Sequence, residues 1–257
     1  MNHFALLTFD VEEFDIPMEF GLNIPMSEQM RIGKQGLDAI DPVLSSVHTT
    51  LFITANFANE YEPDIKRLAA NHEIASHTFY HGSFKEEDLS SSRKRLQQIS
   101  GQPVTGLRMP RMRPIGMEAV AAAGYRYDSS VNPTYLPGRY NNLHLPRTIY
   151  KDQGMTRIPA SVSPGLRIPL FWLSFKNMPY FVFKSLCLQT LRKDGYICLY
   201  FHPWEFADIN NLGLPGYTRR WCGAALTERL QRLVKDLKKE ATFIPINQLP
   251  ALQNVLS

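Results

Sequence analysis

The chain has 257 residues and a net charge of +4, with 44% hydrophobic and 20% charged residues. This composition excludes a disordered or fibrous protein and provides enough apolar side chains for one α/β barrel. The basic residues are scattered apart from short groups, and the chain carries no nucleic-acid-reading motif, so we expect no nucleic-acid partner. No repeat, linker or low-complexity tract divides the sequence, which predicts a single domain over residues 1–257.

Short apolar runs alternate with helical patterns along the chain, which predicts a largely parallel sheet or barrel. The expected strands are Phe4–Phe9, Thr50–Ala55, Glu73–Ser76, Val104–Leu107, Arg126–Tyr127, Thr156–Ile158, Tyr196–Phe201 and Thr242–Ile246. The expected helices are Pro42–Val47, Pro63–Ala70, Glu86–Ile99, Gly116–Ala123 and Leu226–Leu237. The loops Pro17–Gly33 and Tyr135–Leu145 have no regular pattern, and we expect them to shape a substrate pocket.

The segment Leu166–Leu191 is rich in aromatic residues but is interrupted by Lys176, Pro179 and Lys184. These interruptions make it too broken for a membrane-spanning helix. We expect a buried lid, with a contact at a membrane surface as the alternative.

Five polar residues stand where expected strands end: Asp10, His77, Arg108, Asp128 and His202. Catalytic and ligand sites in parallel α/β folds gather at the carboxyl ends of strands. We therefore expect these side chains to meet in one site.

The segment from His77 to His81 places two histidines four residues apart, where one helical turn or a tight loop lets both face one metal ion. Two surface histidines would give the same pattern. The acids after the strand Phe4–Phe9 could complete a metal site or serve as a base, although a solvated strand end is also common. His202 follows an apolar run and could protonate a leaving amine, or it could be a hydrogen-bonded core histidine.

Together these segments resemble the polysaccharide deacetylase family, the NodB-homology carbohydrate esterases. Five motifs occur in the family's order from about Phe4 to Pro203: TFDVEE, HTFYH, GLRMP, GYRYDSS and FHPW. The first motif departs from the family's common pair of adjacent aspartates, because Val11 occupies the second position; it is similar to a D-x-E subgroup. Side chains alternate along a strand, so Asp10 and Glu12 face the same way, which favours Glu12 over Glu13 as the ligand.

The resemblance implies a distorted (β/α) barrel of roughly seven parallel strands with surrounding helices. It implies Asp10 as the base, His202 as the acid, and Glu12, His77 and His81 as ligands of one divalent metal. It also implies that Arg108 is a partner of Asp10 and that Asp128 orients His202. Zinc is the first expectation for the metal, with cobalt, nickel, manganese or iron as alternatives. Arg111 and Arg113 could face an anionic part of the substrate or be simple surface charge.

The activity that follows is removal of an N-acyl group, acetyl first, from an amino sugar in a polysaccharide or glycan precursor. One alternative is hydrolysis of another non-peptide C–N bond, as in a deformylase or an allantoinase. A second is a non-catalytic glycan-binding homologue, which the Val11 departure would favour. The chain shows no signal-peptide pattern, and its three cysteines lack metal or disulfide spacing. We therefore expect a cytoplasmic location, with peripheral contact to a membrane or lipid-linked glycan.

Overall fold

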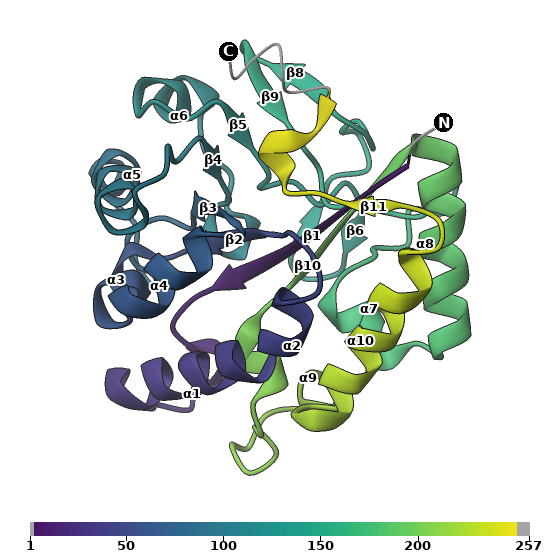
Figure 1. Ribbon diagram of the computed structural model, residues 1–257, viewed down its shortest axis with the longest axis horizontal. Helices are drawn as coiled ribbons and strands as arrows, with labels where there is room; N and C mark the ends of the chain where they lie inside the picture. Colours follow the sequence, from purple (N-terminus) through teal and green to yellow (C-terminus); the bar gives the residue numbers. More distant parts are fainter. Residues whose placement is uncertain (1–2, 251–257) are drawn as a thin grey trace.

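The computed structural model describes residues 3–250 and shows a curled, mostly parallel sheet surrounded by helices (Figure 1). The strand order is β10-β1-β2-β3-β4-β5-β9-β8, with β11 pairing with the start of β1. The strands from β10 to β9 along this path run parallel, and β8 is antiparallel to β9. The predicted α/β fold, a distorted barrel, is confirmed.

The strand bounds are β1 Phe4–Val11, β2 Thr50–Ile53, β3 Glu73–Ser76, β4 Gly106–Leu107, β5 Tyr127–Asp128, β6 Tyr135–Leu136, β7 Tyr140–Asn141, β8 Tyr150–Asp152, β9 Met155–Arg157, β10 Tyr196–Phe201 and β11 Thr242–Phe243. The α-helices are α1 Met26–Ala39, α2 Asp41–Leu44, α3 Ala55–Glu60, α4 Glu62–Ala69, α5 Glu87–Ser100, α6 Met117–Ala122, α7 Trp172–Asn177, α8 Tyr180–Asp194, α9 Gly216–Arg219 and α10 Ala224–Leu237. Single 3-10 turns are η1 Ile16–Phe20, η2 Pro110–Met112, η3 Pro203–Phe206 and η4 Ile246–Gln248.

Strand β1 lies between β10 and β2 and is buried from Ala5 to its end at Val11. It pairs with β10 over six residues on one side and with β2 on the other. Both strands are apolar runs, which suits strands covered on both faces. Their carboxyl ends therefore bring the acids after Phe9 beside His202.

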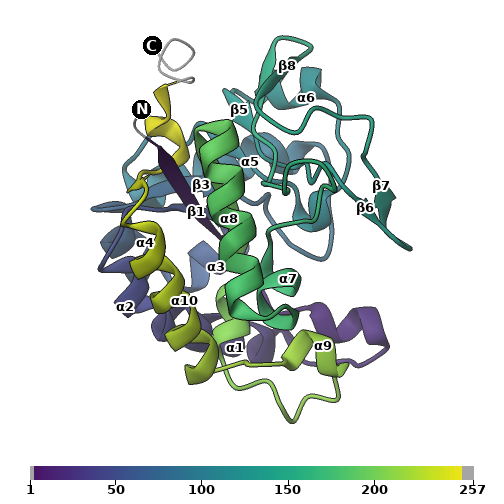
Figure 2. The same cartoon turned by 90° about the vertical axis from the view of Figure 1, so that its right-hand side faces the viewer.

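The barrel is closed irregularly between β9 and β10, which is the distortion in this fold. Ser161 in the intervening segment donates its backbone N–H to the Cys198 carbonyl, and Phe171 forms an isolated bridge with Tyr200. The helix α8 packs on β10 beyond this seam, and Figure 2 shows it beside α10. The β6–β7 hairpin projects away from the body in the same view.

The helix α1 lies in a segment that the sequence analysis predicts to be partly loop. Its interior glycines, Gly33 and Gly36, weaken the helical pattern because glycine is a poor helix former. Both are required by close packing. A Cβ on Gly33 would lie 2.6 Å from the Glu12 carbonyl oxygen, and one on Gly36 would lie 2.0 Å from that of Pro203. These glycines allow α1 to support the two segments that carry Glu12 and His202.

Other differences follow from local signals that apolar periodicity does not carry. The strand expected to reach Ala55 ends at Ile53, because the Thr54 side chain accepts the Phe57 N–H and caps α3. The segment Leu166–Leu191 contains two helices, α7 and α8, which are separated where Pro179 caps α8. In residues 3–250, no helix has both the length and the apolar character needed to cross a membrane.

Candidate active site

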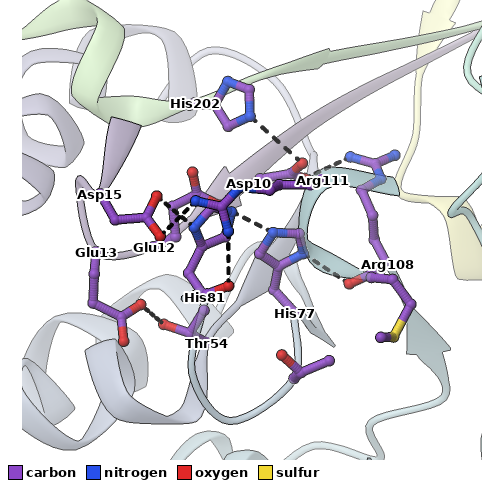
Figure 3. A network of polar contacts seen from close by, with 12 residues as sticks. Asp10, Glu12, Glu13, Asp15, Thr54, His77, His81, Arg108, Arg111 and His202 are labelled. Carbon is purple, nitrogen blue, oxygen red and sulfur yellow. Dashed lines mark hydrogen bonds and ion pairs between the residues drawn. The ribbon is translucent and has the colours of Figure 1, made fainter. Parts of the chain in front are cut away.

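The carboxyl ends of the central strands surround a cavity of about 100 Å³. Asp10 and Glu12 come from the end of β1, His77 and His81 from the loop after β3, and His202 from the residue after β10 (Figure 3). Arg108 follows β4 and lies behind Asp10. The structure thus brings together six of the seven predicted site residues, and Asp128 is the exception.

Glu12, His77 and His81 form a buried cluster whose ligand atoms lie within 4.8 Å of one another. Glu12 Oε2 is 3.0 Å from His77 Nε2 and 3.2 Å from His81 Nε2. Its other oxygen, Oε1, accepts a hydrogen bond of 3.0 Å from the Trp204 indole N–H. Glu13 points elsewhere and accepts hydrogen bonds from Thr54 and Asn56.

The donor set fits a divalent cation. His77 Nδ1 lies 2.7 Å from the Arg108 carbonyl oxygen, and His81 Nδ1 lies 2.8 Å from Asp15 Oδ1. The Arg108 carbonyl oxygen accepts the hydrogen on His77 Nδ1, and the nearby Asp15 carboxylate favours a hydrogen on His81 Nδ1; in this tautomer each ring directs its Nε2 lone pair toward Glu12. Glu12 Oε2 is buried and makes no hydrogen bond to the described residues. Three electron-pair donors that converge without a proton between them are the arrangement expected of a metal site.

The charged groups of this buried cluster stabilise one another. Burial opposes charge on Glu12, but the adjacent histidines His81, His202 and His77 lower the pKa of its carboxyl group well below the ordinary value. Burial likewise opposes charge on His81, yet Glu12 and Asp15 raise the pKa of its ring. The Glu12 carboxylate thus keeps its negative charge despite its burial, and a cation held between Glu12, His77 and His81 would neutralise that charge.

The two histidines lie on a tight loop rather than on a helical turn. Thr78, immediately after His77, has a φ of 65°, a left-handed conformation that is costly for a β-branched residue. Hydrogen bonds hold the loop in this form: the Thr78 and Phe79 carbonyls accept from the backbone N–H groups of Ala55 and Asn56 at the start of α3. The strained turn lets His77 and His81 face the same point, with ring centroids 5.6 Å apart.

Asp10 is held by a buried arginine. Arg108 Nη1 donates to Asp10 Oδ1 at 2.6 Å and to Thr8 Oγ1 at 2.8 Å, while its other nitrogens donate to Ser129. The guanidinium also lies 4.1 Å from the centre of the Phe52 ring. This environment fixes Asp10, whose second oxygen faces His202 Nε2 at 3.9 Å across the cavity.

His202 is oriented by Glu205, and the expectation that Asp128 does so is wrong. His202 Nδ1 lies 3.1 Å from Glu205 Oε1, which also accepts the His202 backbone N–H at 2.7 Å. Asp128 instead pairs with Arg157 at 2.7 Å and accepts hydrogen bonds from Ser130. The Asp128 side chain thus braces the loop after β5. The family resemblance implied Asp128, but Glu205 is one turn away from His202 on η3 and reaches the ring directly.

Residues 34–127 match the family model described as polysaccharide deacetylase. Over this segment, which is less than half of the chain, the protein is similar to polysaccharide deacetylases. The matched segment contains His77, His81 and Arg108, whereas Asp10, Glu12 and His202 lie outside it and are brought to the site by the fold. No curated protein sequence matches the chain.

Solved structures with low sequence identity share the fold. A Mycobacterium smegmatis protein assigned as a polysaccharide deacetylase is 19% identical, with a TM-score of 0.63 and coverage of 99% of this chain and 91% of that one. Puue allantoinase is 14% identical, with a TM-score of 0.59 and coverage of 94% and 86%. A CE4 family pseudoenzyme from Bacillus anthracis is also 14% identical, with a TM-score of 0.51 and coverage of 96% and 65%.

The mouth of the pocket is bordered by the two loops expected to shape it. Glu19 on η1 accepts a hydrogen bond of 2.7 Å from Arg111 and also pairs with Arg139, between β6 and β7. Arg111 additionally donates to Asp15 at 2.8 Å. Arg111 therefore contributes to the pocket wall with its charge already paired, whereas Arg113 lies over the Phe84 ring, 6.0 Å from its centre.

The site also has four supporting side chains that the sequence patterns do not predict: Asp15, Lys176, Trp204 and Glu205. Asp15 and Glu205 each lie within three residues of a predicted site residue, so their acidic character was the available signal. Trp172 on α7 lines the pocket beside His202, with ring centroids 5.3 Å apart. The aromatic segment Leu166–Leu191 thus contributes a wall of the site.

Proposed function

We propose that this protein is a metal-dependent hydrolase that removes an N-acyl group, acetyl first, from an amino sugar in a polysaccharide or glycan precursor. The observation that carries the proposal is one small cavity that holds a buried Glu-His-His cluster, an arginine-bound aspartate and a carboxylate-bound histidine. Metal-assisted amide hydrolysis requires these parts together: a cation site, a base and an acid.

Glu12, His77 and His81 would hold the divalent cation, which when bound supplies Lewis acidity toward the acyl carbonyl and the attacking water. Asp10 takes a proton from that water. Arg108 keeps Asp10 in place during the transfer, since three polar partners and an aromatic ring fix its guanidinium.

His202 then gives a proton to the departing sugar nitrogen as the C–N bond breaks. Its Nε2 faces the cavity because Glu205 binds Nδ1. The C–O bond to water forms and the C–N bond breaks, so the products are a carboxylate, acetate in the first case, and a free amino sugar. Asp10 and His202 line the same cavity from different strands, which allows one to act as base and the other as acid.

The test is turnover of N-acetylated amino sugars and their oligomers, measured by acetate release. We expect Asp10→Asn and His202→Ala each to lower kcat by about 100-fold or more, because each removes one proton-transfer group. His48→Ala, which removes an exposed histidine remote from the pocket, is the matched control. Turnover close to wild type in either site variant would rule out these roles.

A second candidate function is hydrolysis of a different non-peptide C–N bond, as in a deformylase or an allantoinase. The shared fold of Puue allantoinase supports keeping it. A panel of formylated sugars and linear or cyclic amides distinguishes the two, because release of formate or ring-opened product without acetate would favour this alternative. The contact with a membrane or lipid-linked glycan stays a prediction, which co-sedimentation with liposomes tests.

A further inference from the structure

Lys176 is a fully buried lysine on α7 that the proposed reaction does not use. Its ammonium group donates a hydrogen bond of 2.7 Å to the Thr218 carbonyl and lies 3.4 Å from Glu205 Oε2. It also lies 5.6 Å and 5.7 Å from the ring centres of Trp172 and Trp204. A buried cation is costly unless it is paired, so its placement calls for a physical role.

Glu205 connects Lys176 to the catalytic pocket. One carboxylate oxygen faces the Lys176 ammonium, and the other binds both the ring Nδ1 and the backbone N–H of His202. Glu205 is itself fully buried, so solvent does not screen these contacts. Trp204 stacks on the His202 ring at 4.9 Å, which keeps the imidazole in the plane that Glu205 requires. The order Lys176, Glu205, His202 therefore forms a continuous chain of charged contacts.

We propose that Lys176 is a positioning residue for His202 that acts through Glu205: it fixes the carboxylate and balances its charge, so that His202 releases its proton to the departing amine. This inference rests on the proposed function of His202. A carboxylate without its counter-ion would hold the imidazolium proton too strongly, whereas the lysine weakens that hold without touching the substrate.

The charges around His202 define the effect. Asp10 faces its Nε2 from β1, Glu205 binds Nδ1 from η3, Glu12 acts on it from the end of β1, and the Tyr200 ring lies 6.0 Å away on β10. Burial opposes a charge on the ring, whereas Glu205 at 3.1 Å and Asp10 at 3.9 Å favour the protonated form. Lys176 is the cation that offsets one of these carboxylates.

The experiment compares Lys176→Met, Glu205→Gln and the double variant by kcat, KM and the pH dependence of kcat. Removing Lys176 leaves the negative charge of Glu205 without its counter-ion. We therefore expect the alkaline limb of the pH profile to shift to higher pH and kcat to fall by about tenfold, with KM little changed. Glu205→Gln should shift the alkaline limb to lower pH, because the remaining Lys176 ammonium disfavours a positive charge on His202. The double variant should lie between Glu205→Gln and wild type.

The proposal would be overturned if the alkaline limb of Lys176→Met stayed in place or shifted to lower pH. It would also be overturned if the limb of the double variant lay at the same pH as that of Glu205→Gln. Lys184→Met is the matched control, since Lys184 on α8 pairs with Asp236 on α10 and does not contact the site. If Lys176→Met does not fold because Glu205 is left unpaired, the double variant restores neutrality, and its comparison with Glu205→Gln decides.

A measurement without substrate separates an error in the proposed activity from an error in the proposed role of Lys176. Nuclear magnetic resonance titration of the His202 ring, assigned by its loss in His202→Ala, reports the same shifts without any substrate. If no acylated substrate is turned over but the ring titrates in the expected order, the activity is wrong and the role of Lys176 stands. If wild type is active and the order is not observed, the role of Lys176 is wrong.

Discussion

Gly36 is the residue at which helix α1 packs against η3, the turn that follows His202. In an isolated helix, alanine would be favoured over glycine by about 1 kcal/mol. Here the added Cβ would lie 2.0 Å from the Pro203 carbonyl oxygen and 2.7 Å from the Trp204 nitrogen, so α1 and η3 must separate by about 1 Å or more. Overpacking of this kind costs about 1–3 kcal/mol. We expect Gly36→Ala to be less stable than wild type despite the better helix former.

The larger effect of Gly36→Ala falls on the site, because η3 carries Trp204 and Glu205 and follows His202. A displacement of about 1 Å can lower kcat/KM by about 100-fold. The assay is acetate release together with the thermal midpoint. Gly116→Ala is the control, since its φ is −67° and a Cβ there meets nothing within 4 Å. A Gly36→Ala protein as active and as stable as wild type would show that the added Cβ fits without displacing η3.

Three further predictions concern the supporting residues. Asp15→Asn should weaken metal affinity by about 10–100-fold, as measured by competition with a chelator, because Asp15 holds His81; equal affinity would contradict this. Burial raises the pKa of Glu73 from 4.5 to about 7, so its favourable contribution is complete below about pH 4.5 and is lost as the pH rises through about 7. Urea unfolding therefore measures the free energy of unfolding of wild type and of Glu73→Gln at pH 5 and at pH 8. Between these two pH values, the stability of the variant relative to wild type should rise by about 2–3 kcal/mol, and a difference that does not change with pH would contradict this. Arg139→Ala should raise KM by no more than about fivefold with kcat unchanged, since its pair with Glu19 is partly exposed and lies at the pocket mouth; a large loss of kcat would place Arg139 in the chemistry instead.

The chain order and spacing of strand-end residues predicted most of the site. Asp10 and Glu12 face the same side because strand side chains alternate, and β1 extends to Val11 as that geometry requires. His77 and His81 converge because the loop between them is short, although its left-handed turn at Thr78 could not be anticipated from residue types. The parallel strands then bring Arg108 and His202 to the same edge.

What the sequence could not predict depends on packing across long separations. Glu205 rather than Asp128 reaches His202, because Arg157 and Ser130 occupy the Asp128 carboxylate. Helix α1 lacks a strong sequence signal since its glycines serve contacts with Glu12 and Pro203 that are distant in sequence. Lys176 interrupts an apolar segment for the sake of a carboxylate 29 positions later, which no local pattern encodes.

Metal content by mass spectrometry shows whether Glu12, His77 and His81 bind a cation. Wild type should be compared with the His77→Ala/His81→Ala double variant, each purified without chelator and again after incubation with zinc or cobalt. We expect about one transition metal per chain in wild type and none in the variant. Wild type that retains no metal under any of these conditions would contradict the account, because Glu12 and the two histidines would then not form a cation site.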